Sequence, residues 1–187
     1  SLHDALPIST DIAIWIPVGL FWVLGRQSSP LRAVFAGMAL AARDRGGPPL
    51  VGQVLDYPML DDRTAADRSL DPVRHYLWNN RSNRVGWRSY LGVEPGAPDV
   101  PRYAAPARRE NLAGLPPTWI GCGDIELFHG EDRRYAEALA AAGVPTVLDL
   151  VQGAPHAFES IRGGAAVSTA YLRRAEGWLR GHLAGGL

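Results

Sequence analysis

The chain has 187 residues, of which 47% are hydrophobic and 20% charged, a composition typical of one globular domain with a buried core. Nineteen basic and nineteen acidic residues cancel, so the charge favours neither a nucleic-acid partner nor an anionic membrane. A single cysteine, Cys122, excludes an internal disulfide and favours a reducing compartment, which we expect to be the cytoplasm. No group of Cys and His has metal-ligand spacing, so we expect no metal and no cofactor.

The first apolar segment, Ile12–Leu24, is interrupted by Pro17 and Gly19. It is too short to cross a bilayer, which takes about 20 apolar residues. Acidic residues, Asp4 and Asp11, precede it, whereas a secretory signal begins with a basic region. We therefore expect either a buried strand or a stretch that does not represent the natural protein.

From residue 31 onward, helix-like and strand-like segments alternate. Leu31–Arg45 is rich in Ala and Leu and is followed by two glycines and two prolines. This pattern predicts a buried helix that ends at the glycines. The later elements are a strand at 50–57, an irregular polar segment at 61–80, a helix at 82–91, a loop at 92–109, a strand at 117–122, a helix at 131–142, a strand at 146–152 and a helix at 167–183. This order predicts an α/β fold in which parallel strands alternate with helices.

Two loops that follow predicted strands contain groups typical of hydrolases. His156 lies among small residues after strand 146–152, and both Asp124 and Glu126 follow strand 117–122. Because the carboxyl ends of parallel strands share one edge of a sheet, an acid and a histidine on these loops can meet. Such a pair is two thirds of a Ser-His-acid triad.

Eight short phrases, in this order and spacing, resemble the C-terminal half of the hormone-sensitive-lipase-like branch of the alpha/beta-hydrolase superfamily. They extend over residues 36–160 and read ALAARDRGGPP (39–49), YPMLDDR (57–63), SNRVGW (82–87), YAAPAR (103–108), LAGLPP (112–117), LFHGED (127–132), LAAAGVP (139–145) and GAPHAF (153–158). The resemblance implies a partial alpha/beta-hydrolase fold for residues 36–187.

The resemblance also implies roles for the two loops. His156 matches the family's general base, and Glu126 matches the acid that orients it. Asp124 is the alternative acid; otherwise we expect it to bond backbone amides in its loop. Trp78 and Trp87 are expected to pack a loop behind the site, with a place in the acyl pocket as the alternative.

The nucleophile is the least regular part of the resemblance. The family places its serine in a G-x-S-x-G turn ahead of the Ala-rich helix, and counting back from Ala36 puts it at Ser29. No glycine flanks Ser29, and Pro30 has no N–H to donate to an oxyanion. The alternative interpretation makes Ser29 a helix N-cap and Pro30 the first helical residue.

The resemblance implies a carboxylic ester hydrolase that acts on short-chain acyl esters, small-molecule substrates, through an acyl-enzyme. Every departure from the family pattern lies in residues 1–35, which we interpret as a segment foreign to the natural protein. The alternative function, from a different class, is a catalytically inactive hydrolase fragment or a non-enzymatic binding module. The sequence predicts no oligomeric state.

Overall fold

The computed structural model describes residues 30–161 and 164–184. Within them, three parallel strands form one sheet in the order β1-β2-β3. The strands are β1 (Gln53–Asp56), β2 (Thr118–Gly123) and β3 (Thr146–Val151). The predicted α/β fold with parallel strands is confirmed, and the Ile12–Leu24 segment lies outside the described residues.

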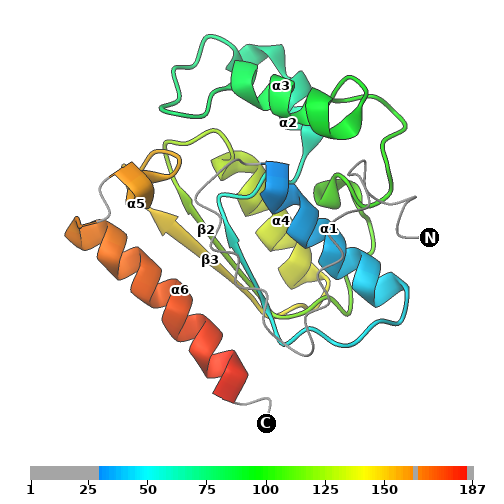
Figure 1. The fold of residues 1–187 in the computed structure, drawn as a ribbon, viewed down its shortest axis with the longest axis vertical. Helices are drawn as coiled ribbons and strands as arrows, with labels where there is room; N and C mark the ends of the chain where they lie inside the picture. Colours follow the sequence, from blue (N-terminus) through cyan, green and yellow to red (C-terminus); the bar gives the residue numbers. More distant parts are fainter. Residues whose placement is uncertain (1–29, 162–163, 185–187) are drawn as a thin grey trace.

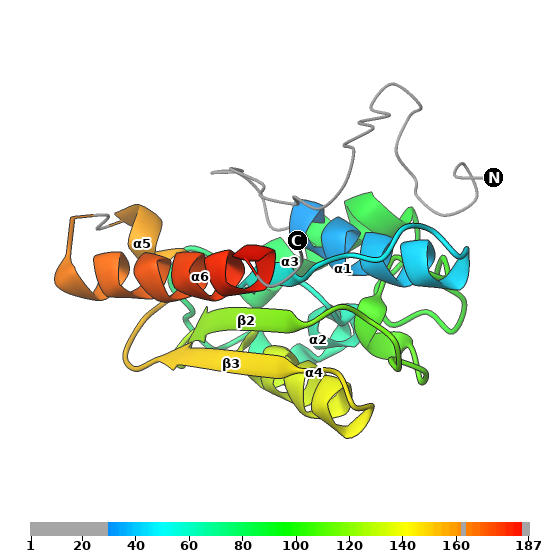
Figure 2. The same ribbon diagram turned by 90° about the horizontal axis from the view of Figure 1, so that it is seen from below.

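Helices cover both faces of this sheet. Helices α1 (Pro30–Asp44) and α6 (Ala166–Ala184) lie on one face, and α4 (His129–Ala141) lies on the other (Figure 2). α4 ends before Gly143, whose φ of 78° is the left-handed conformation that glycine adopts readily. Helices α4 and α6 pack against the central strand from its two faces, and all six residues of β2 are buried.

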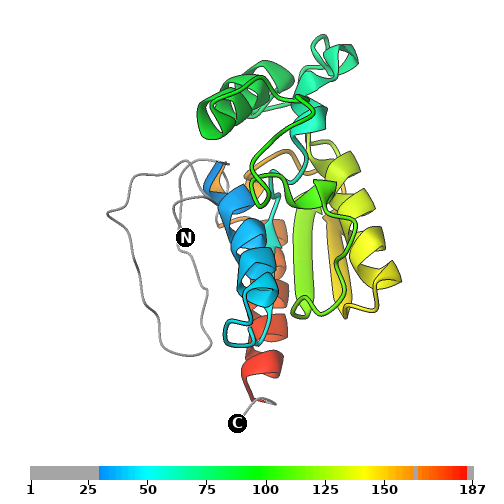
Figure 3. The same cartoon turned by 90° about the vertical axis from the view of Figure 1, so that its right-hand side faces the viewer.

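Smaller helices gather beyond the carboxyl ends of the strands. Helices α2 (Asp62–Ala66) and α3 (Asn80–Leu91) form a layer there, and α5 (Phe158–Ile161) follows the loop after β3 (Figures 1 and 3). Two short 3-10 helices complete the connections, η2 (Arg68–Leu70) and η3 (Pro106–Arg108). These segments therefore cover the carboxyl edge of the sheet, where the sequence predicted the catalytic residues.

The segment 61–80, which we expected to be irregular, contains α2 and η2. Asp61 caps α2 by accepting a hydrogen bond from the Arg63 N–H, and its carboxylate also binds the Arg63 guanidinium at 2.7 Å. Asp67 caps η2 in the same way through Ser69. Helices this short lack a hydrophobic period, so their capping residues are the only sequence signal that they leave.

The loop that contains His156 is held between two buried clusters. One lies under α6 and includes Tyr57, Cys122 and Phe158. The other lies under α3 and includes Trp87 and Phe128. Burial of each large apolar side chain stabilises the fold by about 1.5–3 kcal/mol. The loops at this sheet edge therefore pack against two stable clusters.

Candidate active site

The structure brings His156 and Glu126 into contact at the carboxyl edge of the sheet. Nδ1 of His156 lies 3.0 Å from Oε2 of Glu126, and the two side chains are 8% and 0% exposed. An ionised carboxylate can only accept a hydrogen bond, so Nδ1 holds the proton and the neutral ring has its lone pair on Nε2. This is the tautomer that a histidine needs in order to accept a proton from a nucleophile.

The loop from Gly153 to Ala157 is folded tightly against the end of β2. A Cβ on Gly123 would collide with the backbone carbonyl of Ala154, so only glycine permits this approach. The backbone is left-handed at Gly153 (φ 69°) and at Ala157 (φ 56°). A left-handed alanine is strained, and it directly follows His156. The strain therefore lies in the turn that directs the imidazole.

Asp124 has a different partner from Glu126. Its Oδ1 accepts a hydrogen bond from the backbone N–H of Gly153 at 2.6 Å, and its own N–H donates to the carbonyl of Val151. Asp124 thus joins the acid loop to the histidine loop. Within residues 30–161 and 164–184, Glu126 is the carboxylate that pairs with His156.

Among the described residues, three aromatic rings surround the imidazole. The ring centroids of Tyr57, Phe128 and Trp78 lie 4.7, 5.6 and 6.1 Å from that of His156. Trp78 is stacked at an interplanar angle of 29°, whereas Trp87 is buried in the cluster under α3, where packing was expected. Sequence reasoning gave Tyr57 no role, although its place at the end of a predicted strand already put it at the edge where His156 lies.

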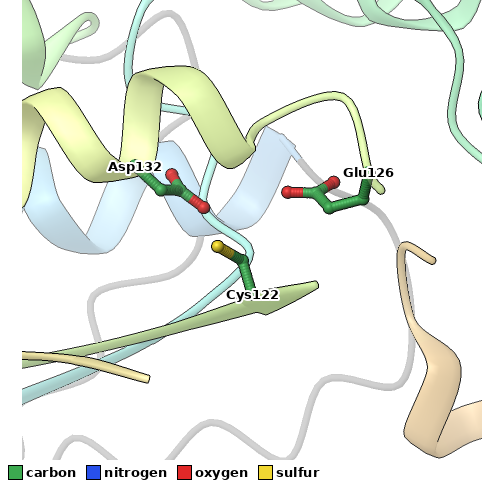
Figure 4. A group of neighbouring side chains, drawn as sticks. All are labelled: Cys122, Glu126 and Asp132. Carbon is green, nitrogen blue, oxygen red and sulfur yellow. The ribbon is translucent and has the colours of Figure 1, made fainter. Parts of the chain in front are cut away.

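A buried thiol and a second carboxylate lie behind Glu126. Single ligand atoms of Cys122, Glu126 and Asp132 all lie within 4.8 Å of one another, and all three residues are buried (Figure 4). Burial raises the pKa of the Cys122 thiol far above its usual value. A thiol that keeps its proton is a poor nucleophile. The cluster therefore packs behind the acid, as expected for Cys122 in a strand.

Ser29, the expected nucleophile, lies outside the described residues. The first described residue is Pro30, at which α1 begins. No helix in the described part of the chain is long and apolar enough to cross a membrane.

A model of the alpha/beta-hydrolase fold family matches residues 33–160, which is more than half of the chain. The chain belongs to the alpha/beta-hydrolase family. Its resemblance to the hormone-sensitive-lipase-like branch is confirmed by curated relatives from Mycobacterium tuberculosis. Esterase LipI is 34% identical over 145 residues, which cover 75% of this chain and 44% of the relative. Carboxylic ester hydrolase LipN is 34% identical over 148 residues, which cover 76% and 38%.

Solved structures give the same picture of this alpha/beta hydrolase. A bacterial heroin esterase is 35% identical with a TM-score of 0.76, and the match covers 81% of this chain and 49% of that chain. Esterase LipW from Mycobacterium marinum is 34% identical with a TM-score of 0.74, and the match covers 83% and 48%. The chain thus spans about half the length of the proteins it resembles.

Proposed function

We propose that the parent of this alpha/beta hydrolase cleaves short-chain carboxylic esters, with His156 as general base and Glu126 as the acid that orients it. The observation that carries the proposal is the 3.0 Å contact between Nδ1 of His156 and Oε2 of Glu126 at the carboxyl edge of the sheet. Esterases among the relatives support the substrate class. The buried Cys122, with no disulfide in this chain, supports the cytoplasm as the compartment.

The chemistry follows from the tautomer of His156. A serine hydroxyl attacks the ester carbonyl while its proton passes to Nε2, and Glu126 stabilises the imidazolium that forms. The imidazolium then protonates the leaving alcohol, and an acyl-enzyme remains. Water, deprotonated by the same nitrogen, releases the carboxylic acid. None of these steps requires a metal or a cofactor.

A specific observation favours a second candidate, in which the 187-residue chain itself is inactive. Pro30 follows Ser29 directly and offers no N–H where the family places an oxyanion donor. Removal of one such donor typically lowers the rate about 10²–10³-fold. The chain also spans about half of its relatives' length.

Hydrolysis of p-nitrophenyl acetate, butyrate and octanoate by the 187-residue chain tests both candidates. If the chain is active, His156→Ala should lower kcat by about 10³-fold or more, and Glu126→Gln by about 10²–10⁴-fold, since Gln stabilises neither the tautomer nor the charge. Glu94→Gln is the matched control, because Glu94 is exposed. Activity that survives His156→Ala would overturn the assignment.

Labelling with a serine-directed phosphonate, read by mass spectrometry, separates the two candidates directly. A modified Ser29 would identify the nucleophile and support the esterase in this chain. A chain that neither turns over the esters nor reacts with the phosphonate is the inactive fragment. Asp124→Asn provides a further comparison: its activity should stay near that of the unmodified chain if Glu126 is the acid.

We also propose that residues 1 to about 35 do not represent the natural protein, because the family match begins only at residue 33. Sequencing the source nucleic acid through the codons for residues 1–40 and upstream tests this. A corrected reading frame with a glycine-flanked serine before Ala36 would support the proposal. A confirmed Ser29-Pro30 would instead favour the inactive fragment.

A further inference from the structure

A small cavity lies beside α4, away from the His156–Glu126 pair. Its volume is about 110 Å³, which is room for three or four waters at about 30 Å³ each. Three segments line it: the stretch after β1, the stretch after η3 and the first turns of α4. Its polar lining residues are Asp61, Arg63, Arg109, Glu131, Arg134 and Tyr135. None of them belongs to the proposed catalytic site.

Two of the three arginines in this cavity lack an ionic partner. Arg63 is bound by Asp61 through two hydrogen bonds of 2.7 and 2.9 Å. In the part of the chain that the structure describes, Arg109 and Arg134 form no ion pair. The Nε of Arg109 is moreover buried and has no hydrogen-bond partner there. Two positive charges therefore remain uncompensated beside one small space.

Tyr135, which follows Arg134 on α4, adds a second unsatisfied donor. Its side chain is 2% exposed, and its hydroxyl has no hydrogen-bond partner among the described residues. A buried hydroxyl without a partner costs about 1–3 kcal/mol, and such groups in folded proteins usually face a water or a ligand. Because Tyr135 lines the same cavity as two unpaired arginines, a ligand that accepts hydrogen bonds would satisfy the hydroxyl once the ring shifts toward it.

The two acids in the lining do not neutralise these arginines. Asp61 is already engaged by Arg63. Glu131 accepts hydrogen bonds from the N–H groups of Leu60 and Asp61, and burial raises the pKa of its carboxyl to about 8. Glu131 is therefore mostly uncharged at neutral pH. The cavity as a whole keeps its positive charge.

We propose that this cavity binds one oxyanion group, a phosphate or a carboxylate, between Arg109, Arg134 and the Tyr135 hydroxyl. Planar guanidinium groups bind both anions through paired N–H donors, and a tyrosine hydroxyl completes the set. The volume is well below the 300 Å³ or more of typical small-molecule pockets, so it admits a single anionic group. A larger ligand would have to extend out past the exposed Arg63 and Arg134.

The test is an NMR titration of the 187-residue chain with inorganic phosphate and, separately, with sodium acetate, each at constant ionic strength. We expect saturable shifts of the backbone amides of Arg109 and Tyr135 with one or both anions; the tighter binder identifies the ligand as phosphate-like or carboxylate-like. Arg109→Gln and Arg134→Gln should each weaken binding about 10-fold or more, and Tyr135→Phe about 3-fold or more.

Arg133→Gln is the matched control, because Arg133 neighbours Arg134 on α4 but is paired with Glu137 and does not line the cavity. It should leave the affinity unchanged. If neither anion produces saturable shifts, or if Arg133→Gln weakens binding as much as Arg109→Gln, the proposal is wrong. The readout is binding and needs no ester turnover, so it stands or falls independently of the proposed function.

Discussion

The His156–Glu126 pair and the cavity at Arg109 and Arg134 treat buried polar groups in opposite ways. At the sheet edge, Oε2 of Glu126 is matched to an imidazole nitrogen at 3.0 Å, and the neighbouring Asp124 is matched to a backbone N–H at 2.6 Å. At the cavity, a guanidinium nitrogen and a phenol hydroxyl are buried without partners among the described residues. Groups that are hydrogen-bonded to each other hold one another in place. Donors without a partner in the protein remain able to form a hydrogen bond with a ligand.

The largest expected effect compares two adjacent arginines. Arg108 binds the fully buried carboxylate of Asp62 through Nε and Nη2, both at 2.7 Å. Arg108→Ala leaves that carboxylate buried without its charge partner, which should lower the free energy of unfolding by about 3–5 kcal/mol. Urea unfolding measures this loss.

Arg109→Ala is the control for that comparison. Arg109 has no ion pair in the described ranges 30–161 and 164–184, so its removal should cost less than about 1 kcal/mol. Equal losses in the two variants would mean that Arg109 is paired after all, and the contrast between matched and unmatched groups would fail.

The second expectation concerns Glu131, whose charge decides how positive the cavity is. Burial raises the pKa of Glu131 from 4.5 to about 8. The unfolded chain therefore releases this proton first, and the stability that Glu131 contributes below pH 4.5 is lost as the pH rises towards 8. Glu131→Gln cannot ionise, so its advantage over the unmodified chain should grow by about 3 kcal/mol between pH 5 and pH 8.

Urea midpoints of the two proteins at pH 5, 6.5 and 8 provide the measurement. A difference that stays constant over this range would show that Glu131 ionises normally. In that case the Glu131 carboxylate would neutralise the charge of one arginine, and the cavity would bind an anion more weakly.

The smallest effect separates the two acids of the proposed active site. Asp124→Ala removes the acceptor for the Gly153 N–H and should cost about 1 kcal/mol. Asp124→Asn keeps an acceptor oxygen and should cost less than half as much. Urea unfolding gives the stabilities, and the amide shift of Gly153 reports the bond. Equal costs for both variants would indicate that the charge of Asp124, rather than its hydrogen bond, holds the two loops together.

Much of the fold was predictable because its signals are local. The predicted strand 146–152 and helix 131–142 correspond to β3 (Thr146–Val151) and α4 (His129–Ala141), since apolar runs and Gly-Pro stops are read from neighbouring residues. Helix α2 was missed because five residues are too few to show a period. The contact between Asp124 and Gly153 agrees with the expectation that this acid bonds backbone amides.

The cavity could not be predicted, because Arg63, Arg109 and Arg134 are far apart in the chain and each resembles an ordinary surface residue. Only packing shows that Arg109 Nε and the Tyr135 hydroxyl are buried without partners. The same holds for the three rings around His156, which come from different segments.

The sequence by itself determined the family, the alternation of strands and helices, and the two loops that contain His156 and Glu126. Each of these depends on residue type and spacing along the chain, and these survive in any conformation. The tertiary structure alone decided which carboxylate meets the imidazole, which arginine is neutralised and which buried acid has a raised pKa. Those outcomes depend on distance and desolvation between segments, which exist only once the chain has packed.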